Sequence, residues 1–78
     1  MQIGLFIKHF HELFEETPVE NIQPETVFRE LEEWDSMIAL SVMILCDEKY
    51  QVRLTPEEMK SAITVNDLFS IISDKINN

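Results

Sequence analysis

Apolar side chains recur at three- and four-residue steps near both ends of the chain, the spacing of one face of an α-helix. The first pattern predicts a helix from about Gln2 to Glu16, ended at Thr17-Pro18 because the residue before proline is pushed out of the helical region. The last pattern predicts a helix from residue 64 to about residue 76. The apolar stripes are Ile3, Phe6, Ile7, Phe10, Leu13 and Phe14 in the first helix, and Val65, Leu68, Phe69, Ile72 and Ile76 in the last.

Residues 37–46 form a run that is apolar on nearly every side. This run predicts a helix from Asp35 or Ser36 to residue 49 or 50, with Asp35 as the N-cap that accepts from the free backbone N–H groups of the first turn. A helix with no polar side is either central in a bundle or partly exposed for binding, and we expect both here. The side chains expected to point inward are Leu40, Met43 and Ile44, whereas Met37 and Ile38 are expected to stay accessible near Ser36.

The sequence Thr55-Pro56-Glu57-Glu58 has the form of an N-cap, a proline at the first helical position and a capping-box glutamate, so it predicts a short helix. A long connection with Pro24 inside it precedes the helix that begins at Ser36. The apolar residues expected to anchor this loop are Val19, Ile22, Val27, Phe28 and Leu31. The predicted fold is therefore all-α: a four-helix bundle with three main helices and one short one, forming a single domain over residues 1–78.

The chain is acidic, with a net charge of −9, and 45% of its 78 residues are hydrophobic. Enough apolar material is present for a core, and the charge disfavours nucleic acid, whose binding requires Lys and Arg. Residues 12–35 hold nine acids and one base, Arg29. This negative field precedes Ser36 and can steer a basic partner, although an acidic surface can also serve solubility alone.

The single cysteine, Cys46, excludes an intramolecular disulfide and fits a reducing compartment. We expect it to be a small buried apolar residue, because no basic neighbour is present to form a thiolate. His9 and His11 are two positions apart, so they cannot share a helix face as metal ligands, and no metal site is predicted. The sequence shows neither a signal peptide nor a membrane span, and the cytoplasm is the expected location.

Ser36 is a hydroxyl at the predicted start of a helix, beside the carboxylate of Asp35 and without a candidate base. A hydrolase nucleophile would require a base and an oxyanion hole, and no Gly-x-Ser-x-Gly sequence is present. Ser36 therefore suits modification by another enzyme better than catalysis. The tetrad Trp34-Asp35-Ser36-Met37 resembles the Asp-Ser-Leu attachment motif of acyl and peptidyl carrier proteins.

The resemblance extends over the whole chain. Asp47-Glu48-Lys49-Tyr50-Gln51-Val52 is similar to a pattern that follows the second helix of acyl carrier proteins, and Thr64-Val65-Asn66-Asp67-Leu68 is similar to the start of their fourth helix. Trp34 stands where many fatty-acid carriers have glycine. Free-standing carriers of specialised pathways often resemble the tryptophan version instead. Ile38 and Ser41 are uncharged where the fatty-acid type carries acids, and Met37 replaces the usual leucine.

This resemblance implies that Ser36 carries a 4'-phosphopantetheine arm, transferred from coenzyme A by a separate phosphopantetheinyl transferase, which would hold the magnesium ion. The arm's thiol would hold an acyl or aminoacyl thioester, so the protein is expected to be a monomeric carrier and not an enzyme. Expected docking residues for basic partner enzymes are Glu30, Glu32, Glu33, Asp35, Met37, Ile38, Asp47 and Glu48. Residues that could yield to an acyl chain are Met43, Leu45, Met59, Ile63 and Phe69, with ordinary core packing as the favoured alternative.

Two alternatives stay open from the sequence. Trp34 is either a loop anchor, which we prefer, or a partner contact. The whole protein could instead be a non-catalytic interaction module whose exposed apolar second helix binds a partner helix in a groove.

Overall fold

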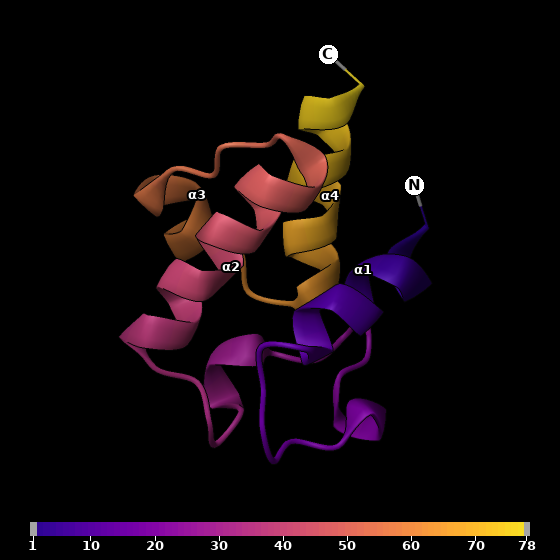
Figure 1. Ribbon diagram of the computed structural model, residues 1–78, viewed down its shortest axis with the longest axis vertical. Coiled ribbons are helices and arrows are strands. Elements are labelled where there is room, and N and C mark those ends of the chain that lie inside the picture. The colour runs from indigo at the N-terminus through magenta and orange to yellow at the C-terminus, as the bar shows by residue number, and fades with distance from the viewer. Residues whose placement is uncertain (1, 78) are drawn as a thin grey trace.

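The computed structural model describes residues 2–77 and confirms the predicted all-α fold (Figure 1). Within that range the chain forms four α-helices: α1 (Ile3–His11), α2 (Ser36–Tyr50), α3 (Pro56–Ser61) and α4 (Val65–Ile76). Two short 3-10 turns, η1 (Val19–Asn21) and η2 (Phe28–Glu30), lie in the long connection between α1 and α2. None of the helices in residues 2–77 has both the length and the apolarity required to cross a bilayer.

Helix α1 ends at His11, so the prediction that it continues to Glu16 and stops at Thr17-Pro18 was wrong. The cause is a contact from a distant part of the chain. The backbone N–H groups of Glu15, Glu16 and Thr17 donate to the carboxylate of Glu33 instead of to carbonyls one helical turn earlier. The apolar stripe nevertheless continues inward beyond the helix, because Phe14 is buried together with Phe6 and Phe10.

Helix α2 begins at Ser36, and Asp35 is its N-cap, as predicted. The Ile38 backbone N–H donates to Asp35 Oδ1 at 2.9 Å. The helix ends at Tyr50, where Gln51 adopts a left-handed conformation with φ of 53°. This residue turns the chain out of the helix.

Helices α3 and α4 both begin with a capping box, and the one at Thr55 was predicted from the sequence. Thr55 accepts from the Glu58 backbone N–H at 3.1 Å, and the Glu58 side chain accepts from the Thr55 N–H at 2.9 Å. Thr64 and Asp67 make the same reciprocal pair at the start of α4. Both helices are thus begun by contacts between residues three positions apart.

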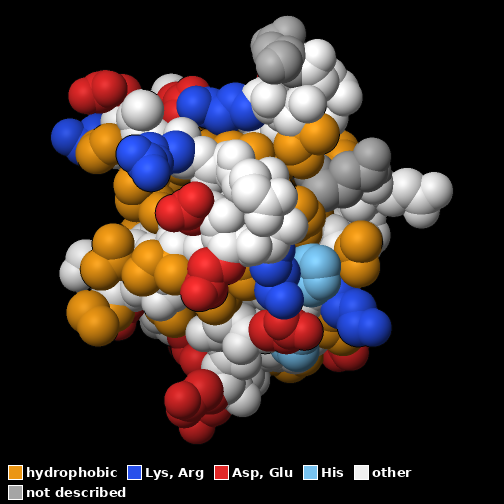
Figure 2. All heavy atoms as spheres, turned by 45° about the horizontal axis from the view of Figure 1, so that its top comes forward, with side chains coloured by type: hydrophobic (Ala, Val, Ile, Leu, Met, Phe, Trp, Pro, Cys, Tyr) orange, Lys and Arg blue, Asp and Glu red, His pale blue; other side chains and the backbone are white. Residues whose placement is uncertain are grey.

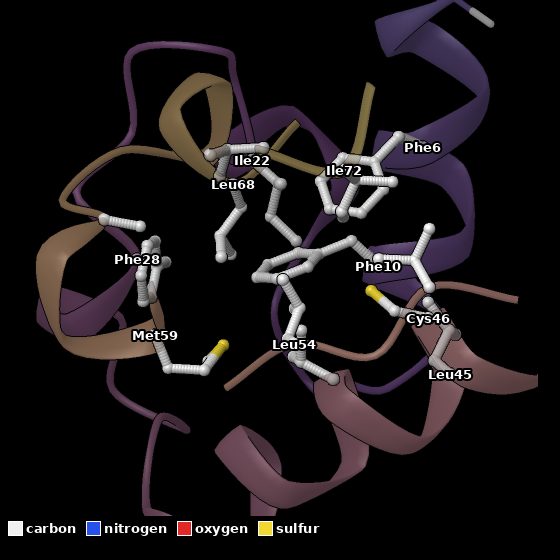
Figure 3. Packing of buried hydrophobic residues seen from close by; sticks show 14 of the residues in the cluster. Phe6, Phe10, Ile22, Phe28, Leu45, Cys46, Leu54, Met59, Leu68 and Ile72 are labelled. Atoms are coloured by element: carbon white, nitrogen blue, oxygen red, sulfur yellow. The ribbon is translucent and has the colours of Figure 1, made fainter. Parts of the chain in front are cut away.

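One hydrophobic core joins the helices and the long connection (Figure 3). Helices α1 and α2 both pack on α4. The buried side of α2 consists of Val42, Leu45 and Cys46, so Leu40 and Ile44 were wrongly predicted to point inward and are about half exposed. The cause is that α2 has apolar side chains all round, so its sequence does not indicate which side faces the core. On α4, Ile76 is also exposed, contrary to the prediction, because it lies in the last turn.

The long connection is fixed to the start of α4. The Val65 N–H donates to the Thr26 carbonyl at 3.0 Å, and the Asn66 N–H donates to the Pro24 carbonyl at 2.8 Å. Of the predicted anchors, Ile22 and Phe28 are buried, Val27 and Leu31 are half-buried, and Val19 is exposed. The connection is therefore fixed in place along its length, and it positions Ser36 at one end of the bundle.

Candidate functional site

Ser36 is the first residue of α2 and is exposed. Asp35, before it, is extended and also exposed, and its carboxylate caps the helix. The first-turn N–H groups and the helix dipole make this position favourable for a negatively charged group. Ser36 is thus presented outward, where another enzyme can reach its hydroxyl.

Trp34 anchors the chain immediately before the site. Its ring is half-buried and lies 4.8 Å from the ring of Phe28 and 6.4 Å from that of Phe10, both measured between centroids. These contacts with two fully buried rings support the interpretation of Trp34 as a loop anchor. They also fix the approach of the chain to Ser36.

Glu33, predicted as a docking residue, is engaged within the molecule. Its carboxylate accepts from the hydroxyl of Thr17 and from three consecutive backbone N–H groups. The hydroxyl first, and then the backbone N–H groups, hold the pKa of Glu33 at about 2 against the opposing effect of desolvation. This carboxylate fixes the loop and has little capacity left for a partner.

The remaining predicted acids form two exposed groups rather than one cluster. Glu30, Glu32 and Asp35 lie close to Ser36 in the sequence, whereas Asp47 and Glu48 lie near the other end of α2. Eleven helical positions separate Ser36 from Asp47, which corresponds to about 16 Å along the axis. Two negative regions therefore lie at the two ends of α2.

An apolar stripe lies between these acids, on the outer face of α2. Met37 is 68% exposed, Leu40 52% and Ile44 51%, and their spacing of three and four residues places them on one side of the helix. Figure 2 shows hydrophobic side chains gathered on the left side of the molecule, where α2 and α3 lie in Figure 1. The sequence did not indicate this stripe, because an all-apolar run offers the i, i+3, i+7 spacing on every side of the helix. Ile38, which was expected beside Met37 on the accessible side, is half-buried and packs against the core.

A pocket of about 350 Å³ opens between α2 and α3 beside Ser36. Its lining comprises Ser36, Ala39, Leu40 and Met43 from α2, Pro56, Met59 and Lys60 from α3, and Arg29 and Trp34 from the long connection. Of the five residues predicted to yield to an acyl chain, only Met43 and Met59 line this pocket. Leu45 is buried in the core, Phe69 packs near Phe6 at 6.0 Å between ring centroids, and Ile63 is exposed.

The chain's other reactive groups lie apart from Ser36. His9 Nδ1 is 2.7 Å from the Tyr50 hydroxyl, and His11 Nε2 is 2.8 Å from the Thr17 carbonyl oxygen. Cys46 is fully buried, as predicted, and this burial raises the pKa of its thiol to about 12. No group of three or more His, Cys, Asp or Glu residues suited to a metal ion is found in the part of the chain that the structure describes.

The comparison with curated proteins identifies a relative. The chain is 32% identical over 57 residues to an acyl carrier protein of Acidothermus cellulolyticus (strain ATCC 43068 / DSM 8971 / 11B), a match that spans 73% of this chain and 68% of that protein. No family model matches the chain. No solved structure matches it either. The match and the helix order agree, and this chain belongs to the acyl carrier protein family.

Proposed function

We propose that this protein is a non-catalytic carrier that holds an acyl or aminoacyl group on a 4'-phosphopantetheine arm attached to Ser36. It would deliver this group to enzymes of fatty-acid, polyketide or related biosynthesis. The observation that carries the proposal is the exposed hydroxyl of Ser36 at the N-terminus of α2, beside an apolar-walled pocket. The membership of the acyl carrier protein family supports it independently.

The residues around Ser36 fit a phosphodiester. The N-terminus of the 15-residue α2 favours a negative group there, by about 0.3–1 kcal/mol for an exposed site. The carboxylate of Asp35 is already accepting the Ile38 N–H, so its role is to hold the first turn in place. When bound, the arm would supply a terminal thiol that carries the cargo as a thioester.

The surface of α2 supports a docking role with three parts. Glu30, Glu32 and Asp35 lie before or at its start, Asp47 and Glu48 lie near its end, and the stripe of Met37, Leu40 and Ile44 lies between them. We propose that a phosphopantetheinyl transferase and the acyl-loading and acyl-transferring enzymes bind here. Their basic residues would meet the acids, and an apolar surface would cover the stripe.

The pocket beside Ser36 is the proposed shelter for the cargo. Met43 and Met59 face it from opposite helices, and methionine side chains adapt readily to an irregular occupant. An acyl chain there would be removed from water at a favourable free energy of about 0.8 kcal/mol for each buried CH₂.

Intact-mass measurement tests the attachment. The protein is incubated with coenzyme A, magnesium and a transferase of broad specificity, and we expect a gain of one phosphopantetheine. Ser36→Ala should abolish the gain, whereas Ser70→Ala, at an exposed position on α4, should leave it unchanged. A gain that persists in Ser36→Ala would move the attachment to another residue.

The alternative function is an interaction module that binds a partner through the stripe on α2. The half-exposed Leu40 and Ile44 favour this alternative, because a surface of this kind suits partner binding with or without an arm. Unchanged mass with several transferases, each shown to modify a known carrier, would select it over the carrier function.

A further inference from the structure

Arg29 joins the long connection to the end of α3. It lies in η2, next to the fully buried Phe28, and its guanidinium carbon is 4.9 Å from the centroid of the Phe28 ring. Its Nη1 donates to the Ala62 carbonyl at 2.6 Å, and its Nη2 donates to the Met59 carbonyl. One planar guanidinium therefore spans two carbonyls with two donors in a fixed geometry, whereas the donors of an ammonium group share a single nitrogen.

These carbonyls belong to the C-terminal end of α3, where helical oxygens lack intrahelical partners and carry partial negative charge. The Ile63 N–H, which would continue the helix by donating to the Met59 carbonyl, donates to Asp67 at 3.0 Å instead. Arg29 satisfies the oxygen that is left and adds a favourable charge at this helix end.

Few other contacts hold α3 in place. Among its six residues only Met59 is buried, beside Phe28 in the core cluster (Figure 3). At the opposite end of α3, Glu58 forms an ion pair with Lys75 at 2.9 Å, and Lys75 also donates to the Arg53 carbonyl. Helix α3 is thus held to α4 at its first turn and to the long connection, through Arg29, at its last.

We infer that Arg29 is a positioning residue: it holds the end of α3 against the long connection and thereby sets the width of the pocket beside Ser36. Arg29 itself lines the pocket, and α3 provides one wall through Pro56, Met59 and Lys60. Without the hydrogen bonds from Arg29, the last turn of α3 would open more often and move away from the pocket, while the Glu58–Lys75 ion pair still holds the first turn. The effect of this motion on cargo rests on the proposed function, whereas the motion itself does not.

Amide hydrogen exchange of the unmodified protein tests whether Arg29 holds the end of α3 in place. Arg29→Met keeps most of the aliphatic stem and removes the donors, and Arg29→Lys keeps the charge but replaces the planar pair of donor nitrogens with a single ammonium. We expect the Met59 and Ala62 amides, which donate to the Thr55 and Glu58 carbonyls, to exchange at least about tenfold faster in Arg29→Met. In Arg29→Lys the increase should be intermediate, and α4 amides should keep their rates in both variants. Arg53→Met, which removes an exposed arginine, is the matched control and should change neither set.

Equal exchange of α3 in wild type and both variants would overturn the inference. An equal rise in the exchange rates of the α4 amides would also overturn it, because Arg29 would then stabilise the whole fold and not α3 alone. Neither result depends on attachment of the arm.

The second measurement uses the loaded protein. Thioesters of increasing acyl length are made on wild type and Arg29→Lys, and their hydrolysis is compared with that of the acetyl thioester. We expect the variant to protect the thioesters of longer acyl chains from hydrolysis than wild type does, because its pocket opens further. Identical chain-length profiles would refute the control of the pocket by Arg29. Failure of Ser36 to accept any arm would refute the proposed function and leave the exchange result standing.

Discussion

The Glu33 carboxylate accepts a hydrogen bond from the Thr17 hydroxyl at 2.5 Å across 16 positions of sequence. The same carboxylate accepts the N–H groups of Glu15, Glu16 and Thr17. One acid therefore keeps α1 from continuing to Glu16 and closes the long connection into a loop just before Trp34 and Ser36. A negative group that satisfies three consecutive N–H groups acts much as a cap does at a helix start.

This contact should make the stability of the protein depend on pH. The pKa of Glu33 is lowered from 4.5 to about 2 in the folded chain, so its contribution is present in full above pH 4.5 and is lost as the pH falls from 4.5 towards 2. We expect Glu33→Gln to lower the free energy of unfolding at pH 7 and to have a much smaller effect near pH 2. Urea unfolding at both pH values measures this difference. Glu32→Gln, at the exposed neighbouring position, is the control, and an equal loss from both variants would contradict the assignment.

The sequence was sufficient for features that depend on near neighbours. The caps at Asp35, Thr55 and Thr64 each involve a partner three positions away, so the local sequence contains both halves of the contact. The end of α1 depends on Glu33, far along the chain, and no periodicity in residues 2–16 indicates it.

The orientation of α2 could not be predicted for a different reason. Its apolar residues lie on every side, so Leu40 and Ile44 are indistinguishable by pattern from the buried Val42 and Leu45. Ser36 was found because its motif is local. The pocket beside it depends on where α3 sits, which is decided by a guanidinium from the long connection.

Gly4 is a place where the fold can be made more stable. It lies in α1, and a Cβ added there would have no neighbouring atom within 4 Å. Gly4→Ala should raise the free energy of unfolding by about 0.5–1 kcal/mol, because alanine loses less backbone entropy in a helix. Thermal and urea unfolding measure the gain. A variant no more stable than wild type would indicate that α1 is not helical at this position.

Cys46 should be unreactive in the folded protein. Its side chain is fully buried and burial raises the pKa of its thiol to about 12, so the thiolate that reacts with disulfide reagents is almost absent at pH 8. Titration of the unmodified protein should give no thiol in the native state and one in denaturant. After attachment of the arm, the native protein should give one. Rapid labelling of a thiol in the native, unmodified protein would contradict this prediction. If Cys46→Ala abolished that labelling, α2 would have to open away from the core.

The stripe on α2 should act in binding and not in folding. Leu40→Ala truncates a side chain that is 52% exposed, so the free energy of unfolding should change by no more than about 0.5 kcal/mol. If a partner covers the stripe, the KM of a transferase for the protein should rise about tenfold, the loss typical of a buried interface side chain. Leu5→Ala, at a 50% exposed position on α1, is the matched control and should leave KM unchanged. A different result would contradict this role of the stripe: KM unchanged in Leu40→Ala, together with a KM that rises with salt in wild type. The transferase would then recognise the acids at the two ends of the helix and not the stripe.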